Sequence, residues 1–263
     1  MTLTKIATLT KIAIGAVLAA TALAGTASAQ QIKVGIAAEP YPPFASPDAA
    51  GTWSGWEVEM ITAVCKAATL ECELTPVAWD GIIPSLTGSQ IDVIMASMSI
   101  TDERMQTIDF SDAYYNTPAV IVADKNLDVD ASPASLAGKI IGIQASTTHQ
   151  AYANAYFAAG SEIKVYQTQD DANQDLVAGR VDAIQADSIA MADFVNSDAG
   201  ACCEIKGAVA KDDAILGKGV GAGVRKGDTD LRDKLNAGIA AVIADGTHAE
   251  ITSRYFTTSI LAD

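Results

Sequence analysis

Short apolar runs rich in β-branched residues alternate with longer segments of helical periodicity along most of the chain. Residues 32–37 predict a first strand, and residues 57–68 carry apolar side chains at helical spacing, with Glu57 and Glu59 outside the apolar stripe. A strand over residues 72–77 is expected to follow that helix. This alternation is typical of parallel sheets covered by helices, so we expect an α/β fold.

The same plan recurs further along the chain. A helix over residues 81–87, capped by Asp80, precedes a buried strand over residues 91–96, and residues 170–178 and 181–187 repeat this order. In both places the helix ends near a glycine, and the next strand runs out into a polar loop. This repeated order of helix and strand predicts two similar α/β lobes and not one continuous sheet. Ligands of such sheets bind at the carboxyl ends of strands, which indicates the loops after residues 37, 96, 143 and 186.

The amino terminus has a different pattern. Lys5 and Lys11 precede an apolar run over residues 12–24, and small residues follow up to Ala29. This is the order of a secretory signal peptide, which predicts export and cleavage after Ala29. The alternative is a membrane anchor, but a run of about 13 apolar residues is shorter than the ~20 needed to cross a bilayer.

Charge and length exclude some functions. The first 29 residues hold two of the 17 basic residues and none of the 32 acidic ones, so the mature chain of 234 residues has a formal charge of −17. Such a chain does not bind nucleic acid through its phosphates, and an anionic membrane surface repels it. Its length is enough for one large or two small domains with a sizeable core.

Four cysteines fit an oxidising compartment outside the cytosol. Cys65 and Cys72 are close enough to join the end of a helix to the following strand, and the alternative is two buried free thiols. The adjacent Cys202 and Cys203 allow a vicinal disulfide, a redox site or two unrelated thiols. We expect no metal site, because the only two histidines stand far apart and no repeated Cys-x-x-Cys accompanies them. We expect no cofactor either: the glycines within 217–223 match neither a Rossmann fingerprint nor a P-loop.

The polar loop over residues 97–104 carries groups that suit a carboxylate. It supplies hydroxyls, free backbone amides at a predicted helix start, and the planar guanidinium of Arg104, which can hold both carboxylate oxygens. The alternative is that Thr101 caps a surface helix and Arg104 is an ordinary solvated charge.

Other loops complete a candidate site for a zwitterion. Residues 146–149 offer hydroxyl and amide donors at another helix start, and Asp187 offers a carboxylate beyond a strand end. Asp187 alone is more often a helix cap, a role for which Ser188 is an equal candidate. The aromatic residues Tyr41, Phe44 and Trp79 lie at the edges of predicted loops, where their faces can enclose a small ligand.

Several segments resemble, in order, the periplasmic polar amino acid binding proteins of ABC transporters, within the bacterial extracellular solute-binding proteins of family 3 that include lysine/arginine/ornithine- and histidine-binding proteins. The resemblance spans nearly the whole mature chain. The segments that carry it are Tyr41-Pro42-Pro43-Phe44, Ser54-Gly55-Trp56-Glu57, Ile83-Pro84-Ser85-Leu86, Ser99-Ile100-Thr101-Asp102-Glu103-Arg104, Phe110-Ser111-Asp112, Ala178-Gly179-Arg180-Val181-Asp182-Ala183 and Asp245-Gly246-Thr247.

The resemblance implies a type II periplasmic binding protein fold, in which two lobes close on a ligand cleft by hinge motion. Residues 31–120 and 221–263 would form lobe 1, and residues 121–220 lobe 2. Two strands would cross between the lobes, near 118–122 and 217–224.

The resemblance also implies roles for site residues. Arg104 would hold the ligand carboxylate, with backbone amides near Ser99 and Thr148. Asp187 and the carbonyl of Ser97 would hold the ammonium group. Tyr41 and Trp79 would stack on the ligand side chain, and residues 147–149 would line the wall of the second lobe. The full set of expected ligand-binding residues is Glu39, Tyr41, Trp79, Ser97, Met98, Ser99, Arg104, Thr147, Thr148, His149 and Asp187. The spacing of Cys65 and Cys72 resembles a disulfide present in some members that bind basic amino acids.

One departure from the family pattern bears on the ligand. Where many relatives carry an acidic residue three positions before the tyrosine, this chain has Ala38, and its acid is Glu39. If Glu39 faces the cleft, lysine, arginine or an opine-like derivative is expected; if it points away, a neutral or polar ligand is expected. His149 suits a neutral or an acidic side chain, because its charge is adjustable near neutral pH.

The function implied is the periplasmic binding component of an amino acid ABC transporter, a free monomer that docks to an inner-membrane permease. An anchored receptor's sensing module is a rival. The alternative from another class is an enzyme similar to a cyclohexadienyl (prephenate/arogenate) dehydratase, which needs a positioned general acid or base. His149 and Glu39 are the only candidates for that role, and neither stands in a recognisable catalytic spacing. A hydrolase is disfavoured because the chain has no Gly-x-Ser-x-Gly elbow.

Overall fold

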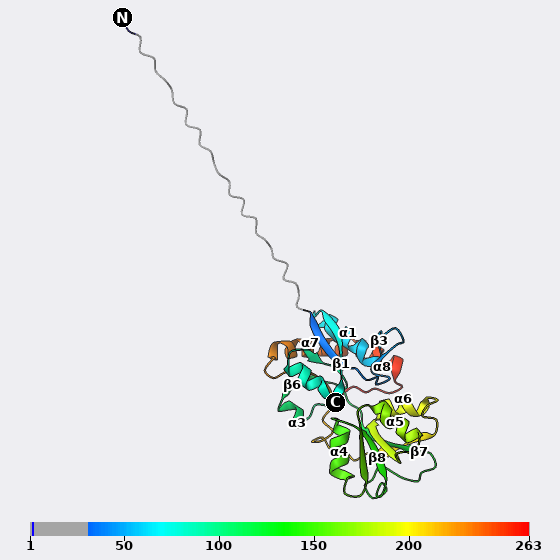
Figure 1. Ribbon diagram of the computed structural model, residues 1–263. Coiled ribbons are helices and arrows are strands. Elements are labelled where there is room, and N and C mark those ends of the chain that lie inside the picture. The colour runs from blue at the N-terminus through cyan, green and yellow to red at the C-terminus, as the bar shows by residue number, and fades with distance from the viewer. Residues whose placement is uncertain (1, 3–30, 263) are drawn as a thin grey trace.

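The computed structural model describes residue 2 and residues 31–262, so the predicted signal peptide lies outside the described residues apart from residue 2. Two five-stranded mixed sheets form the described chain, and each is covered by its own helices, which Figure 1 shows as two lobes. The α/β class and the two-lobe organisation predicted from the sequence are confirmed. Within residues 31–262, no helix is both long and apolar enough to cross a bilayer.

The first sheet has the order β4-β1-β5-β12-β6. Its strands are β1 Ile32–Ala37, β4 Cys72–Val77, β5 Val93–Ile94, β6 Ile108–Tyr115 and β12 Val220–Arg225. The helices of this lobe are α1 Trp56–Ala67, the 3-10 helix η1 Trp79–Gly81, α2 Ile82–Thr87, α3 Asp102–Met105, α7 Thr229–Ala244 and α8 Thr247–Tyr255. A small hairpin is formed by β2 Ser46–Pro47 and β3 Trp53–Ser54.

The second sheet has the order β11-β7-β10-β8-β9. Its strands are β7 Ala119–Asp124, β8 Ile140–Gln144, β9 Glu162–Tyr166, β10 Ala183–Asp187 and β11 Cys203–Ala208, and its helices are α4 Thr148–Tyr156, α5 Gln169–Val177 and α6 Ser188–Asn196. The chain passes between the sheets twice, after β6 and after β11. At the second passage Gly217 has a φ of 87°, and a Cβ there would lie 2.6 Å from the carbonyl oxygen of Ile100, so only glycine fits.

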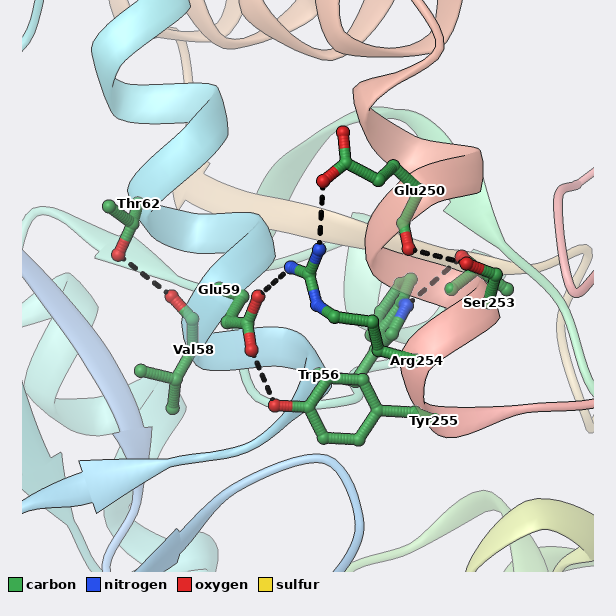
Figure 2. Close-up of polar contacts among 9 residues, drawn as sticks. Trp56, Val58, Glu59, Thr62, Glu250, Ser253, Arg254 and Tyr255 are labelled. Carbon is green, nitrogen blue, oxygen red and sulfur yellow. Dashed lines mark hydrogen bonds and ion pairs between the residues drawn. The ribbon is translucent and has the colours of Figure 1, made fainter.

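Helix α1 is fixed to α8 by polar contacts that Figure 2 shows. The indole Nε1 of Trp56 donates to Oγ1 of Thr252 at 3.1 Å. The carboxylate of Glu59 accepts from the hydroxyl of Tyr255 at 2.6 Å and from the guanidinium of Arg254. These contacts join the first turn of α1 to α8.

The cysteines take two different forms. Cys65 in α1 and Cys72 at the start of β4 form a disulfide, which confirms the pairing suggested by their spacing. Cys202 and Cys203 are both free, with Cys203 buried, so the structure shows no bond between these neighbours. Burial raises the pKa of the Cys203 thiol to about 12, which keeps it protonated at neutral pH.

Two local predictions are wrong. Asp80 does not cap α2: it lies in η1, and Gly81 precedes α2 without a side-chain hydrogen bond. Glu57 is not on a solvent-facing side of its helix, because its side chain is 1% exposed. Helical periodicity places a residue relative to the face packed on the sheet, but it does not show that a loop of the same lobe covers the first turn.

Candidate functional site

A cavity of about 420 Å³ lies between the two lobes, a volume typical of small-molecule sites. Residues from the carboxyl ends of β1, β5, β8 and β10 line it, as expected for ligand sites of such sheets. The structure brings ten of the eleven predicted residues to its wall: Glu39, Tyr41, Trp79, Ser97, Ser99, Arg104, Thr147, Thr148, His149 and Asp187. The remaining one, Met98, is not on the wall, because its side chain is 1% exposed and packs in the core among α2, β5 and β6.

Arg104 is turned toward the cavity by the short helix α3. Thr101 caps that helix by accepting from the backbone N–H of Arg104 at 3.2 Å. The cap, which was the alternative explanation of this loop, is therefore present together with an arginine that lines the cavity. Arg104 Nη1 donates to the carbonyl of Ser99 at 3.0 Å, and Nη2 to that of Ser146 at 3.4 Å. Its guanidinium carbon lies 5.6 Å from the ring centroid of Trp79, a cation–π distance.

Arg104 forms no ion pair among the described residues, since none of the ion pairs within residues 31–262 includes it. Burial lowers its pKa to about 10, so it remains charged at neutral pH. A guanidinium that is charged and largely enclosed attracts an anion, and a carboxylate matches its planar fork.

Asp187 has a structural role and also lines the cavity. Its Oδ1 accepts from the backbone N–H of Ile189 at 2.8 Å and caps α6, while Oδ2 accepts from the hydroxyl of Thr117. Burial raises its pKa to about 6, and the bonds to Thr117 and the cap oppose that rise. Asp187 therefore carries a poorly solvated negative charge at pH 7, which a ligand cation would stabilise.

Glu39 is one of the residues that line the cavity. Its carboxylate accepts from the backbone N–H of Trp79 at 3.1 and 3.4 Å, which holds it against the wall of the first lobe. The neighbouring Ala38 is exposed. The acid that is shifted by one position in the sequence thus reaches the cleft.

His149 faces the same region from the second lobe. Its Nδ1 is enclosed and has no hydrogen-bond partner among the described residues. Burial and the nearby charge of Arg104 lower its pKa to about 4, so the imidazole is neutral at pH 7. It can accept or donate a hydrogen bond there, but it does not bring a positive charge.

Sequence reasoning missed Glu57, which also lines the cavity. Its carboxylate accepts from Ser97 N at 3.0 Å, from Ser97 Oγ at 2.9 Å and from the hydroxyl of Tyr114. Burial raises its pKa, and these three hydrogen bonds oppose that rise. The available signals were its place in the family-like segment Ser54-Gly55-Trp56-Glu57 and its position directly after an aromatic residue at a helix start.

Two α/β lobes with a charged cleft between them define a binding protein for a small polar solute. The chain belongs to the bacterial extracellular solute-binding proteins, family 3, whose family model matches residues 32–258. It is 40% identical to the L-arginine-binding protein of Pseudomonas aeruginosa over 88% of this chain and 89% of that protein. It is 37% identical to the histidine-binding periplasmic protein of Salmonella typhimurium over 85% of this chain and 87% of that protein.

A solved structure shows the same fold. An ancestral arginine-binding protein bound to arginine superimposes with a TM-score of 0.78 at 32% identity, covering 86% of this chain and 98% of that one. The family and the named relatives are binding proteins, so this chain is a solute-binding protein and not an enzyme. The predicted family is thereby confirmed, and the dehydratase alternative is set aside.

Proposed function

We propose that this protein binds a cationic L-amino acid in the periplasm and delivers it to an ABC transporter permease. The charge of the cavity carries the proposal. Glu39, Glu57 and Asp187 line the same cavity as Arg104, while the other cation on its wall, Lys211, lies 3.3 Å from the Asp213 carboxylate. Since Arg104 and Asp187 are matched by the two charges of an amino acid, an excess of negative charge remains for a cationic side chain. Relatives named for arginine and histidine support this choice.

The cavity accommodates the ligand in one orientation. Its carboxylate binds Arg104, together with backbone amides near Ser99 and Thr148. Its ammonium group lies between Asp187 and the carbonyl of Ser97. The side chain then extends along the aromatic wall of Tyr41 and Trp79 toward Glu39. Aromatic faces suit a planar guanidinium, so arginine satisfies every charged group in this arrangement.

The proposal also includes export, lobe closure and docking to the permease. Residues 1–29 serve as the signal peptide, cleaved after Ala29, and the mature monomer works in the periplasm. Residues 31–120 with 221–263 form lobe 1, residues 121–220 form lobe 2, and hinge closure encloses the ligand. The closed form then docks to the inner-membrane permease.

A calorimetric panel on refolded, ligand-stripped protein tests this function. We expect the tightest binding for L-arginine, L-lysine and L-ornithine, with weaker binding for L-histidine and L-glutamine, and none for L-glutamate or prephenate. A ligand that binds only the folded state also raises the melting temperature, which gives an independent readout. Tight binding of an acidic amino acid, or no binding of any amino acid, would contradict the proposal.

The affinity for L-arginine is expected to depend on pH through Asp187. Its pKa of about 6 in the free protein must fall when the ligand ammonium arrives, because the ammonium stabilises the charged carboxylate. The affinity should therefore be constant above pH 7 and decrease by up to about tenfold per pH unit as the pH falls below 6. The neighbouring Tyr41 stays neutral, because burial raises its pKa, and His149 becomes protonated only near pH 4.

Titrations from pH 5 to 8, in buffers of different ionisation enthalpy, check both the affinity and the proton release. The variant Asp187→Asn should show a flatter profile. An equal pH dependence in the two proteins would exclude Asp187 as its origin.

Trp79 is expected to slow ligand release. Its indole Nε1 donates to the carbonyl of Ser146 at 3.3 Å, a hydrogen bond that joins the two lobes. The variant Trp79→Phe keeps an aromatic face but loses this bond, which is worth about 0.5–1.5 kcal/mol. Stopped-flow measurements should show L-arginine dissociating roughly two- to tenfold faster, with little change in the association rate. Trp79→Leu, which also loses the aromatic face, should cost more; identical release from wild type and Trp79→Phe would exclude this role.

A further inference from the structure

We propose that Glu57 is a positioning residue for the ligand ammonium group, which it serves by holding the backbone of Ser97 so that the Ser97 carbonyl is presented to the cavity. This assignment rests on the proposed amino acid ligand. The carboxylate binds Ser97 at two points, accepting from its backbone N–H at 3.0 Å and from its hydroxyl at 2.9 Å. Both the backbone and the side chain of one residue are thereby fixed by a single buried group.

The conformation of Ser97 needs such support. Its φ is 53°, in the left-handed region that residues with a side chain rarely occupy. A residue held there persists only when the surrounding structure over-determines it, and such positions cluster at ligand sites. The carbonyl oxygen of Ser97 accepts no hydrogen bond within residues 31–262, although the residue lies on the cavity wall. That oxygen is free to receive a donor from a ligand.

Glu57 is itself rigidly held. Two other residues in the first turn of α1, Trp56 and Glu59, are bound to α8, as Figure 2 shows. From the core, the hydroxyl of Tyr114 in β6 donates to the Glu57 carboxylate. Contacts to α8 and to β6 therefore fix the carboxylate, and it in turn fixes Ser97.

The chemistry of the position requires an acceptor. Three donors converge on the carboxylate: the N–H and hydroxyl of Ser97 and the hydroxyl of Tyr114. An ionised carboxylate only accepts, so it satisfies all three. A buried negative charge behind Ser97 also makes the site more favourable for an ammonium group.

The test uses two probes, L-arginine and 5-guanidinopentanoate, which is arginine without its α-ammonium group. Wild type and the variants Glu57→Gln, Glu57→Ala and Tyr114→Phe are titrated with both. Glu57→Ala should weaken L-arginine binding at least tenfold and change the affinity for 5-guanidinopentanoate by less than twofold. Glu57→Gln, which keeps an acceptor oxygen, should lie between wild type and Glu57→Ala. Tyr114→Phe removes one of the contacts that hold the Glu57 carboxylate, so it should weaken L-arginine binding less than Glu57→Ala does and leave the affinity for 5-guanidinopentanoate within about twofold of wild type.

Three outcomes would overturn the assignment. The first is equal weakening for both probes, which indicates a structural role, and the second is unchanged L-arginine binding in a folded Glu57→Ala protein. The third combines two measurements on Glu57→Gln or Glu57→Ala. A crystal structure of the variant shows Ser97 still in its left-handed backbone conformation, and calorimetry shows wild-type affinity for L-arginine. Wild-type binding separates the two proposals: if wild type binds neither probe nor any cationic amino acid, the proposed function fails, whereas binding that is indifferent to Glu57 removes only this inference.

Discussion

The variant Arg104→Ala is expected to lose L-arginine affinity by roughly two to four orders of magnitude while keeping its fold. The guanidinium is charged, enclosed and without a carboxylate partner among residues 31–262, so the ligand carboxylate depends on it for neutralisation. Removing one partner of a buried ion pair costs about 3–5 kcal/mol, and each 1.4 kcal/mol is a factor of ten. The fold should tolerate the change, because α3 keeps its Thr101 cap, which binds the backbone of residue 104.

Titration calorimetry checks the affinity, and the ligand-free melting temperature checks the fold. Arg104→Lys is the matched control, since it keeps the charge but loses the planar fork. We expect its affinity to lie between those of wild type and Arg104→Ala. Wild-type affinity in Arg104→Ala would show that the carboxylate binds elsewhere.

The variant Asp187→Asn is expected to weaken L-arginine binding by about two orders of magnitude. The substitution removes the negative charge that faces the ligand ammonium, and hydrogen bonds between charged groups are worth about 1.5–3 kcal/mol each. Asparagine caps helices as well as aspartate does, so the bond to Ile189 and the start of α6 should survive. The loss should therefore appear in binding and not in ligand-free stability.

A matched control separates the charge from the cap. Asp187→Ala removes both, and losing a cap costs about 1 kcal/mol, so its ligand-free melting temperature should fall below that of Asp187→Asn. Calorimetry and thermal denaturation of both variants make the comparison. If Asp187→Asn bound L-arginine as tightly as wild type, the carboxylate would act only as the cap of α6.

Elements whose pattern is strong follow from the sequence with little error. Strands β1 and β4 have the predicted bounds, because each is a short run closed by turn residues. The carboxyl ends of parallel strands meet at one edge, and so the predicted loops came together around one cavity. Turn and strand signals are local, and local signals can be read without a structure.

The rest depends on contacts that the sequence does not record. Met98 lies between Ser97 and Ser99 in a loop that faces the ligand cleft, but its side chain points the other way, into the core. Glu57 lies at the start of α1 and is covered by the loop that follows β5. The residue of that loop that binds it, Ser97, is 40 positions away in sequence. Periodicity along one helix contains no information about such a partner.

Glu39 shows the same limit for specificity. The sequence left open whether this acid faces the cleft, because the answer depends on the turn between β1 and the tyrosine. The structure places its carboxylate on the backbone N–H of Trp79, at the cavity wall. A hydrogen bond across 40 positions in sequence fixes the position of this carboxylate, which the local pattern could not predict.

The most direct measurement is a crystal structure of the mature protein with L-arginine bound. We expect the ligand in the cleft between the lobes, with its carboxylate on Arg104, its ammonium group between Asp187 and the Ser97 carbonyl, and its guanidinium directed toward Glu39. A ligand outside this cleft, or one whose carboxylate lies away from Arg104, would contradict this expectation.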